Sequence, residues 1–205
     1  MSLSASARYD VDLAPTGLAL VHDFLNTRAA GRPRQADLLA DLDTARAWFD
    51  GAVDLWAERT GAPRPEVEPF GAGDLPRLAR MREQLTVLLR ARDGEEADAA
   101  EGRALTGRVR LTLGPDGVLV AEPRGDGREW LTGALLAEVQ RAQQTDTWRR
   151  LKVCRSHLCS GAFYDRSRNN SGVWHDVRVC GNAVNLRASR ARRRAAPRDL
   201  TGPTT

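Results

Sequence analysis

The sequence lacks several features that would assign it to a common class. It has no apolar run long enough to cross a membrane, and its first fifteen residues have no basic segment followed by an apolar one. It has no glycine-rich phosphate loop, no Gly-x-Ser-x-Gly elbow and no zinc-deaminase pattern. We therefore expect a cytoplasmic protein with no membrane association that is not an enzyme.

The charges of the chain are divided unevenly along its 205 residues. Residues 148–198 hold thirteen Lys or Arg and two acidic residues, whereas residues 1–147 hold eighteen Arg and twenty-four acidic residues. An acidic body with a basic end is typical of a nucleic-acid-binding module joined to another unit. We expect domains at 1–147 and 148–198 and a disordered tail at 199–205.

The few cysteines of the chain are gathered in the basic segment. All three, Cys154, Cys159 and Cys180, lie within 27 residues, and His157 and His175 lie between them. An odd number of thiols cannot pair completely as disulfides, and a segment of about fifty residues buries too little apolar surface to fold easily without a metal. The spacing therefore predicts a Zn2+ site in which binding energy contributes to folding.

The fourth ligand is chosen between two histidines. His175 precedes Cys180 by the same spacing that separates Cys154 from Cys159, so the two pairs match. His157 lies inside the loop between Cys154 and Cys159, where a turn that brings both thiols to one ion leaves the middle residues pointing away. We expect Cys154, Cys159, His175 and Cys180 to bind the zinc. The alternative is free thiols with two solvated histidines.

The run from Cys154 through Trp174 to Cys180-Gly181-Asn182 resembles the CGNR zinc finger. In that family, Trp is usually followed by a cysteine ligand, so His175 would be a replacement that zinc accepts. The signature Arg is Ala183 in this chain. The resemblance implies zinc binding and binding to double-stranded DNA, and the change at Ala183 bears on the DNA contacts rather than on the metal site.

Residues 20–27, Leu-Val-His-Asp-Phe-Leu-Asn-Thr, resemble the opening motif of the ABATE domain, which commonly precedes the CGNR finger. Asn26 and Thr27 match a recurrent Asn-Thr of that family. Together the two resemblances imply a bacterial transcription regulator whose N-terminal domain senses a small-molecule effector or mediates association. The sequence leaves open whether the protein forms a homo-oligomer, which DNA sequence it recognises and which effector it binds.

The arginines of the basic segment are candidates for contacts with DNA phosphates, since guanidinium groups form bidentate bonds with phosphate oxygens. We expect residues 176–194 to form a helix with Cys180 on its inner face and arginines elsewhere. For Arg192 to Arg198, a solubilising tail is an equal alternative. The candidate DNA-binding residues are Arg166, Arg168, Arg178, Arg187, Arg190, Arg192, Arg193 and Arg194.

The hydrophobic pattern predicts an α+β fold. Apolar residues at helical spacing predict helices over 17–29, 41–59, 74–94 and 129–145, and a short polar one over 95–105. Val109, Leu111 and Leu113 alternate with polar residues before a Gly-Pro-Asp-Gly turn, which predicts a β-hairpin over 108–123. The expected architecture is a helix-rich N-terminal domain with a β-hairpin, followed by a small zinc finger that ends in a basic helix.

Two features of the N-terminal region allow a functional interpretation beside a structural one. His22 and Asp23 are neighbours on a helix, where they point about 100° apart, so we expect His22 to be structural or solvated. Trp48, Phe49 and Trp56 lie on or beside one helical stripe, which favours core packing over a ligand pocket. Two other classes therefore remain: an interaction module stabilised by zinc without DNA binding, and a small-molecule-binding or enzymatic N-terminal domain.

Overall fold

The computed structural model describes residues 4–31, 33–94, 104–156, 158–182 and 186. The described chain is α+β, as expected, with four α-helices and two small antiparallel hairpins. The helices are α1 (Leu18–Leu25), α2 (Leu42–Thr60), α3 (Leu75–Arg92) and α4 (Gly127–Gln144). No helix in the described ranges has both the length and the apolar character needed to cross a membrane.

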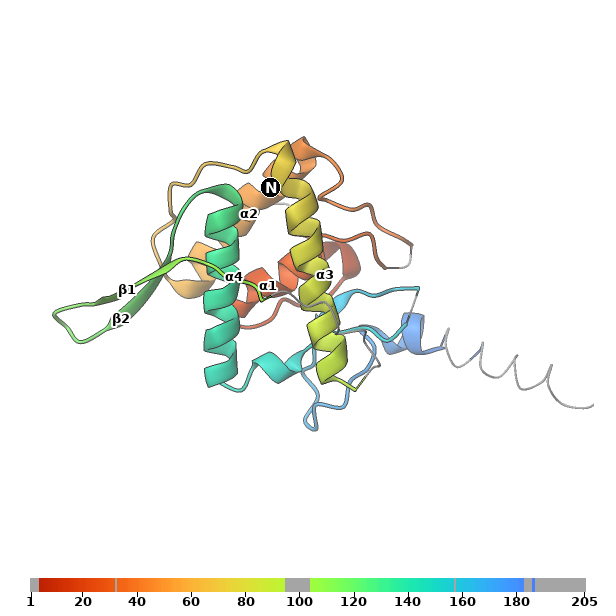
Figure 1. Cartoon of the computed structure of the whole chain (residues 1–205). Helices are drawn as coiled ribbons and strands as arrows, with labels where there is room; N and C mark the ends of the chain where they lie inside the picture. Colours follow the sequence, from red (N-terminus) through yellow and green to blue (C-terminus); the bar gives the residue numbers. More distant parts are fainter. Residues whose placement is uncertain (1–3, 32, 95–103, 157, 183–185, 187–205) are drawn as a thin grey trace, which may run out of the picture.

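Helix α1 is the centre of the helical core (Figure 1). All eight of its residues are buried, and it contacts α2, α3, α4 and strand β4. It is shorter than the expected 17–29, because Asn26 leaves the helical conformation and Thr27 donates its hydroxyl hydrogen to the carbonyl of Phe24 (2.7 Å). That bond satisfies one of the carbonyls that a helix end leaves without a partner.

The long helices follow their sequence patterns closely. Helix α2 begins at an N-cap, Asp41, whose carboxylate accepts from the Thr44 N–H (2.8 Å), and it ends at Gly61 with φ of 72°. Helix α3 follows Asp74, but this carboxylate does not cap the helix; it accepts from the Gly71 N–H (3.2 Å) and pairs with Arg128 (3.1 Å). The predicted helix over 95–105 falls mostly outside the described residues.

The predicted hairpin is confirmed as β1 (Val109–Leu113) and β2 (Leu119–Pro123), which pair in antiparallel register. It projects from the helices, with its base against α4 (Figure 1). Sequence patterns missed the second hairpin, β3 (Leu151–Val153) and β4 (Ala162–Tyr164), whose strands are three residues long. Leu151, Val153 and Ala162 lie in the same hydrophobic cluster as the four helices. The boundary at 147/148 stays a prediction.

The expected basic helix is seen only at its start. Residues Val177–Gly181 form a single π-helical turn, called η5, and Asn182 continues in helical conformation. The rest of the predicted helix, apart from Leu186, and the tail at 199–205 lie outside the described residues.

Candidate metal centre

Four elements bring the predicted zinc ligands together. Cys154 follows β3, Cys159 lies in the turn before β4, His175 lies in the loop after β4, and Cys180 lies in η5. One ligand atom from each residue lies within 4.8 Å of all the others, and the three thiols are buried. The site is therefore assembled from one short stretch of chain.

The turn between the first two cysteines is held by backbone bonds. The Cys159 N–H donates to the Ser156 carbonyl (2.8 Å), and the Cys154 N–H donates to the Gly161 carbonyl (2.8 Å). Ser160 adopts a left-handed conformation with φ of 57°, after which the Gly161 N–H points at the Cys159 sulfur (3.4 Å). This N–H stabilises negative charge on the sulfur, as a thiolate ligand requires.

The second half of the site is held by Asp176. Its carboxylate accepts from the N–H groups of Arg178 (2.6 Å) and Val179 (3.0 Å), which caps the turn that carries Cys180. These N–H groups lower the pKa of Asp176. Trp174 packs against the cysteine cluster, and a side chain added at Gly181 would meet its indole ring at 3.1 Å. Packing therefore explains why Trp174 precedes the ligand His175 and why Gly181 follows the ligand Cys180.

The side-chain geometry fits a tetrahedral metal. The Nδ1 atom of His175 lies 3.2 Å from the sulfur of Cys159 and 3.4 Å from that of Cys180. Tetrahedral zinc with Zn–S bonds of about 2.3 Å and a Zn–N bond of about 2.0 Å places a nitrogen and a sulfur ligand roughly 3.5 Å apart, so these distances need only small adjustments. His157 lies outside the described residues, and its exclusion from the site stays a prediction.

Without a cation nearby, two of the three thiols resist ionisation. A hydrogen bond to Cys159, together with burial, raises the pKa of Cys154 to about 12, and burial raises that of Cys180 to about 11. The same bond from Cys154 lowers the pKa of Cys159. Three thiolates in one buried cluster are unfavourable unless a metal offsets their charge. Soft sulfur donors with one imidazole in a closed set of four are the ligands that structural zinc prefers.

Residues 150–193 match the CGNR zinc finger family, and this segment is called the CGNR finger. The match covers the segment that carries all four ligands, and together they make the centre a zinc site. A search of curated proteins finds no match to the chain.

A buried ion pair supports the loop of the CGNR finger that leads to His175. Lys152, the one lysine of the chain, donates to Asp165 (2.8 Å) and to the carbonyls of Asn170 (2.7 Å) and Gly172 (3.0 Å). Asp165 also accepts from the N–H groups of Ser167 (2.9 Å) and Gly172 (2.7 Å). Burial opposes ionisation of Asp165, but Lys152 and these donors hold its pKa far below the usual range. Asp165 is thus a hydrogen-bond acceptor that holds this loop.

Helix α1 holds the CGNR finger from the other side, which sequence reasoning did not predict. Asn26 accepts from the Ala162 N–H (2.8 Å) and donates to the Ala162 carbonyl (3.1 Å). His22 lies 3.0 Å from the same carbonyl through Nε2, while its Nδ1 accepts from the Ala14 N–H (3.1 Å). This pattern requires the neutral Nε2–H form, and burial lowers the pKa of His22. His22 is therefore structural.

The candidate DNA-binding arginines are only partly described. Arg166 donates to the Leu13 carbonyl (2.7 Å) and lies over the ring of Tyr164, so it is held against the body. Arg168 and Arg178 are exposed. The remaining candidates, Arg187, Arg190, Arg192, Arg193 and Arg194, lie outside the described residues, so their contacts stay predictions.

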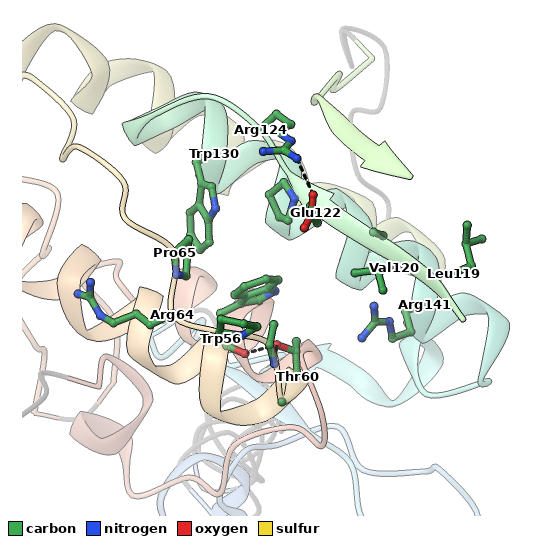
Figure 2. Close-up of a pocket in the computed structure, with 15 residues that line it drawn as sticks. Trp56, Thr60, Arg64, Pro65, Leu119, Val120, Glu122, Arg124, Trp130 and Arg141 are labelled. Atoms are coloured by element: carbon green, nitrogen blue, oxygen red, sulfur yellow. Dashed lines mark hydrogen bonds and ion pairs between the residues drawn. The ribbon is translucent and has the colours of Figure 1, made fainter. Parts of the chain in front are cut away.

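The aromatic stripe of α2 is mainly core, as expected. Trp48 is fully buried and donates to Asp23 (2.9 Å), and Phe49 packs on Phe70 and Trp130. Trp56 differs because it meets an open groove of about 540 Å3 (Figure 2). The groove lies between residues 60–65 and strand β2, and Arg64, Arg124 and Arg141 reach its rim. Trp56 and Trp130 both line the groove, but they are only 6% and 2% exposed, so little of either side chain is accessible.

Proposed function

We propose that this protein is a DNA-binding transcription regulator in which a zinc-stabilised CGNR finger presents arginines to the phosphate backbone. The observation that carries the proposal is the combination of a closed Cys3His centre with a strongly basic surrounding segment. The metal fixes the segment, and the arginines supply charge that releases counterions from DNA. In a bacterial cell, action on DNA would place the protein in the cytoplasm.

The zinc in this proposal has a structural role. Four protein side chains complete the tetrahedron, whereas a catalytic zinc keeps one position for water or substrate. The carboxylate of Asp165, which directly follows β4, accepts hydrogen bonds from Lys152 and from two backbone N–H groups. No enzymatic activity is therefore part of the proposal.

The test measures binding of the zinc-loaded chain to duplex DNA by fluorescence anisotropy at several salt concentrations. Replacing Arg192, Arg193 and Arg194 by Ala should lower the slope of log affinity against log salt by about 3 if each contacts one phosphate. A matched control replaces three exposed arginines of the N-terminal region, Arg59, Arg77 and Arg80, and removes the same charge. The control slope should stay close to that of the parent.

Failure of the parent to bind any duplex, with one zinc per chain present, would reject DNA binding. It would favour the alternative of a zinc-stabilised interaction module, for which the replacement of the signature Arg by Ala183 is the supporting observation. Equal slopes for the two triple variants would show that the net charge of the chain, rather than the basic end, drives binding.

A second candidate function is effector binding by the N-terminal region, which the groove at Trp56 favours. Its three rim arginines suit an anionic ligand, although Arg64 and Arg124 already pair with carboxylates on the same surface. Anionic small molecules that bind there should change the fluorescence of Trp56, and a Trp56→Phe variant should lose that change. Unchanged fluorescence across a panel of such molecules would remove this candidate.

A further inference from the structure

The hairpin β1–β2 exposes apolar side chains far from the zinc centre. Leu111, Leu113 and Leu119 are 63%, 69% and 61% exposed, and Val118 and Val120 are also exposed. The register places Leu111 opposite Ala121 and Leu113 opposite Leu119, so the three leucines lie on one face of the ribbon. A two-stranded hairpin alone in water is marginally stable, and an exposed apolar face of this kind marks an interaction surface.

The two outer edges of the hairpin differ in their capacity to pair. The Arg124 N–H donates to the Arg108 carbonyl (3.0 Å), and the Gly114 N–H donates to the Val118 carbonyl (2.8 Å). These two bonds establish which opposing residue pairs of the hairpin are hydrogen-bonded to each other. The alternation of an antiparallel pair then turns the N–H and C=O groups of positions 109, 111 and 113 outward on β1, and those of 119, 121 and 123 outward on β2. Position 123 is Pro123, which has no N–H to offer.

Proline at an outward position blocks the β2 edge against further pairing, as natural edge strands often do. Strand β1 has no such protection, since Val109, Leu111 and Leu113 all have an N–H. Among the described residues, no strand pairs with this edge, because the sheet has the two strands β1 and β2. The tip also lies clear of the helices (Figure 1). The β1 edge is therefore the one open to a partner strand.

We propose that two copies of this chain associate by antiparallel pairing of their β1 edges about a two-fold axis at Leu111. In this register, Leu111 lies opposite Leu111 of the second copy, and Val109 lies opposite Leu113 of the second copy. All three pairs use outward-pointing N–H and C=O groups, so the hydrogen-bonding phase is satisfied. The result is one four-stranded sheet with the order β2–β1–β1–β2 and a continuous apolar face.

The charges of β1 favour this register over its neighbour. With the axis at Leu111, Arg110 lies opposite Thr112 of the second copy, and Glu122 remains its partner within its own hairpin. Moving the axis to Val109 would set Arg110 opposite Arg108 twice, and like charges directly opposite are destabilising. The pairing is self-complementary, which is why a second copy is the expected occupant.

Pairing of two five-residue strands buries a small area, so a dimer in the micromolar range is expected. The experiment is sedimentation velocity of the full, zinc-loaded chain over a concentration series. Leu111→Lys places two ammonium groups at the axis and should raise the dimer Kd by about tenfold or more. Val118→Lys, in the turn outside the paired strands, should leave it within about threefold of the parent.

Position 112 tests the register itself. Thr112→Glu sets a carboxylate opposite Arg110 of the second copy and should tighten the dimer by roughly threefold or more, whereas Thr112→Arg should weaken it. Zinc content and far-UV circular dichroism of each variant establish that it is folded. A parent that stays monomeric throughout the series overturns the proposal. So does a dimer whose Kd is the same for Thr112→Glu and Thr112→Arg, or one that Leu111→Lys leaves unchanged.

Discussion

Asp37 and Arg82 form a charged pair that ties the chain after α1 to α3. Arg82 donates to both carboxylate oxygens (2.8 and 2.6 Å) and to the Thr27 hydroxyl (2.9 Å), and its side chain is 9% exposed. Burial opposes ionisation of Asp37, but the bonds from Arg82 and the Leu39 N–H outweigh it and lower its pKa. The ionised form is therefore more stable in the folded chain than in the unfolded one.

Asp37→Asn should destabilise the helical core by about 1–3 kcal/mol at pH 7, because it leaves a largely buried guanidinium without its counter-charge. The pKa of Asp37 is lower in the folded state, so its contribution is complete above the unfolded value near 4 and is lost as pH falls below that value. Urea unfolding with chelator present, from pH 3 to 7, measures both the loss of stability and its dependence on pH. The exposed pair Asp50–Arg64 is the control, since Asp50→Asn should cost below about 1 kcal/mol. A loss for Asp37→Asn that does not shrink at acid pH would contradict the linkage.

The choice of His175 as fourth ligand is tested by zinc content. His175→Ala and Cys180→Ser should each lose zinc on dialysis, since three ligands hold the ion far less tightly than a closed set of four. His157→Ala should keep one zinc per chain. Elemental analysis of the purified variants decides the question. Zinc retained in His175→Ala but lost in His157→Ala would reverse the assignment.

At the scale of elements, the contact between α1 and the β3–β4 hairpin joins the helical core to the zinc site. Asn26 satisfies both backbone groups of Ala162, and the chain then runs through Gly161 to Cys159, whose carbonyl accepts from the Gly31 N–H (3.1 Å). Asn26 and Gly31, which both follow α1, thus hold the backbone at the ligand Cys159 and three residues after it at Ala162. Zinc affinity should depend on a residue that does not touch the metal.

Asn26→Ala should cost about 1–3 kcal/mol, because the buried Ala162 N–H loses its partner. It should also speed transfer of zinc to a chelator, as the turn that carries Cys159 loosens. A chromophoric chelator measures the rate, and Asn169→Ala, at an exposed loop position, is the control. Equal zinc-transfer rates for Asn26→Ala and the parent would show that the contact between Asn26 and the hairpin does not support the metal site.

The elements that sequence patterns predicted are those with local causes. Helices α2, α3 and α4 have apolar stripes over many turns, and β1–β2 has alternation on both sides of a Gly-Pro-Asp-Gly turn. Strands β3 and β4 are too short to show a period, and β4 depends on Asn26, which is 136 residues away from Ala162. The sequence signal that pointed to Asn26 was its match to a family motif, which gave no partner.

The zinc ligands were predictable for a different reason. Thiols are rare in this chain, and metal chemistry admits few residue types, so spacing alone selected the four residues that the structure brings together. The arginines have no such constraint. Nothing in the sequence distinguished Arg150, which donates to the Asp165 and Ser167 carbonyls, from the exposed Arg168.

At the scale of the whole molecule, two kinds of stabilisation meet in one chain. The helical core contains the large buried side chains Trp48, Trp130, Phe24 and Phe70, and it extends to Leu151 and Val153 of β3. Among the described residues, the three cysteines form a separate cluster against which the partly buried Trp174 packs. The metal should therefore matter most for the region between Cys154 and Gly181 and least for the helices.

Removal of zinc by a chelator should separate these two parts. The far-UV helical signal should change little, because α1–α4 keep their shared core, whereas Trp174 should lose its packing against the cysteines and emit at longer wavelength. Trp174→Phe supplies the control, since the remaining emission comes mainly from the buried indoles of the core and should not shift. Loss of most helical signal on chelation would contradict this expectation. It would show that the bonds of Asn26 and His22 to Ala162 make the helices and the CGNR finger one cooperative unit.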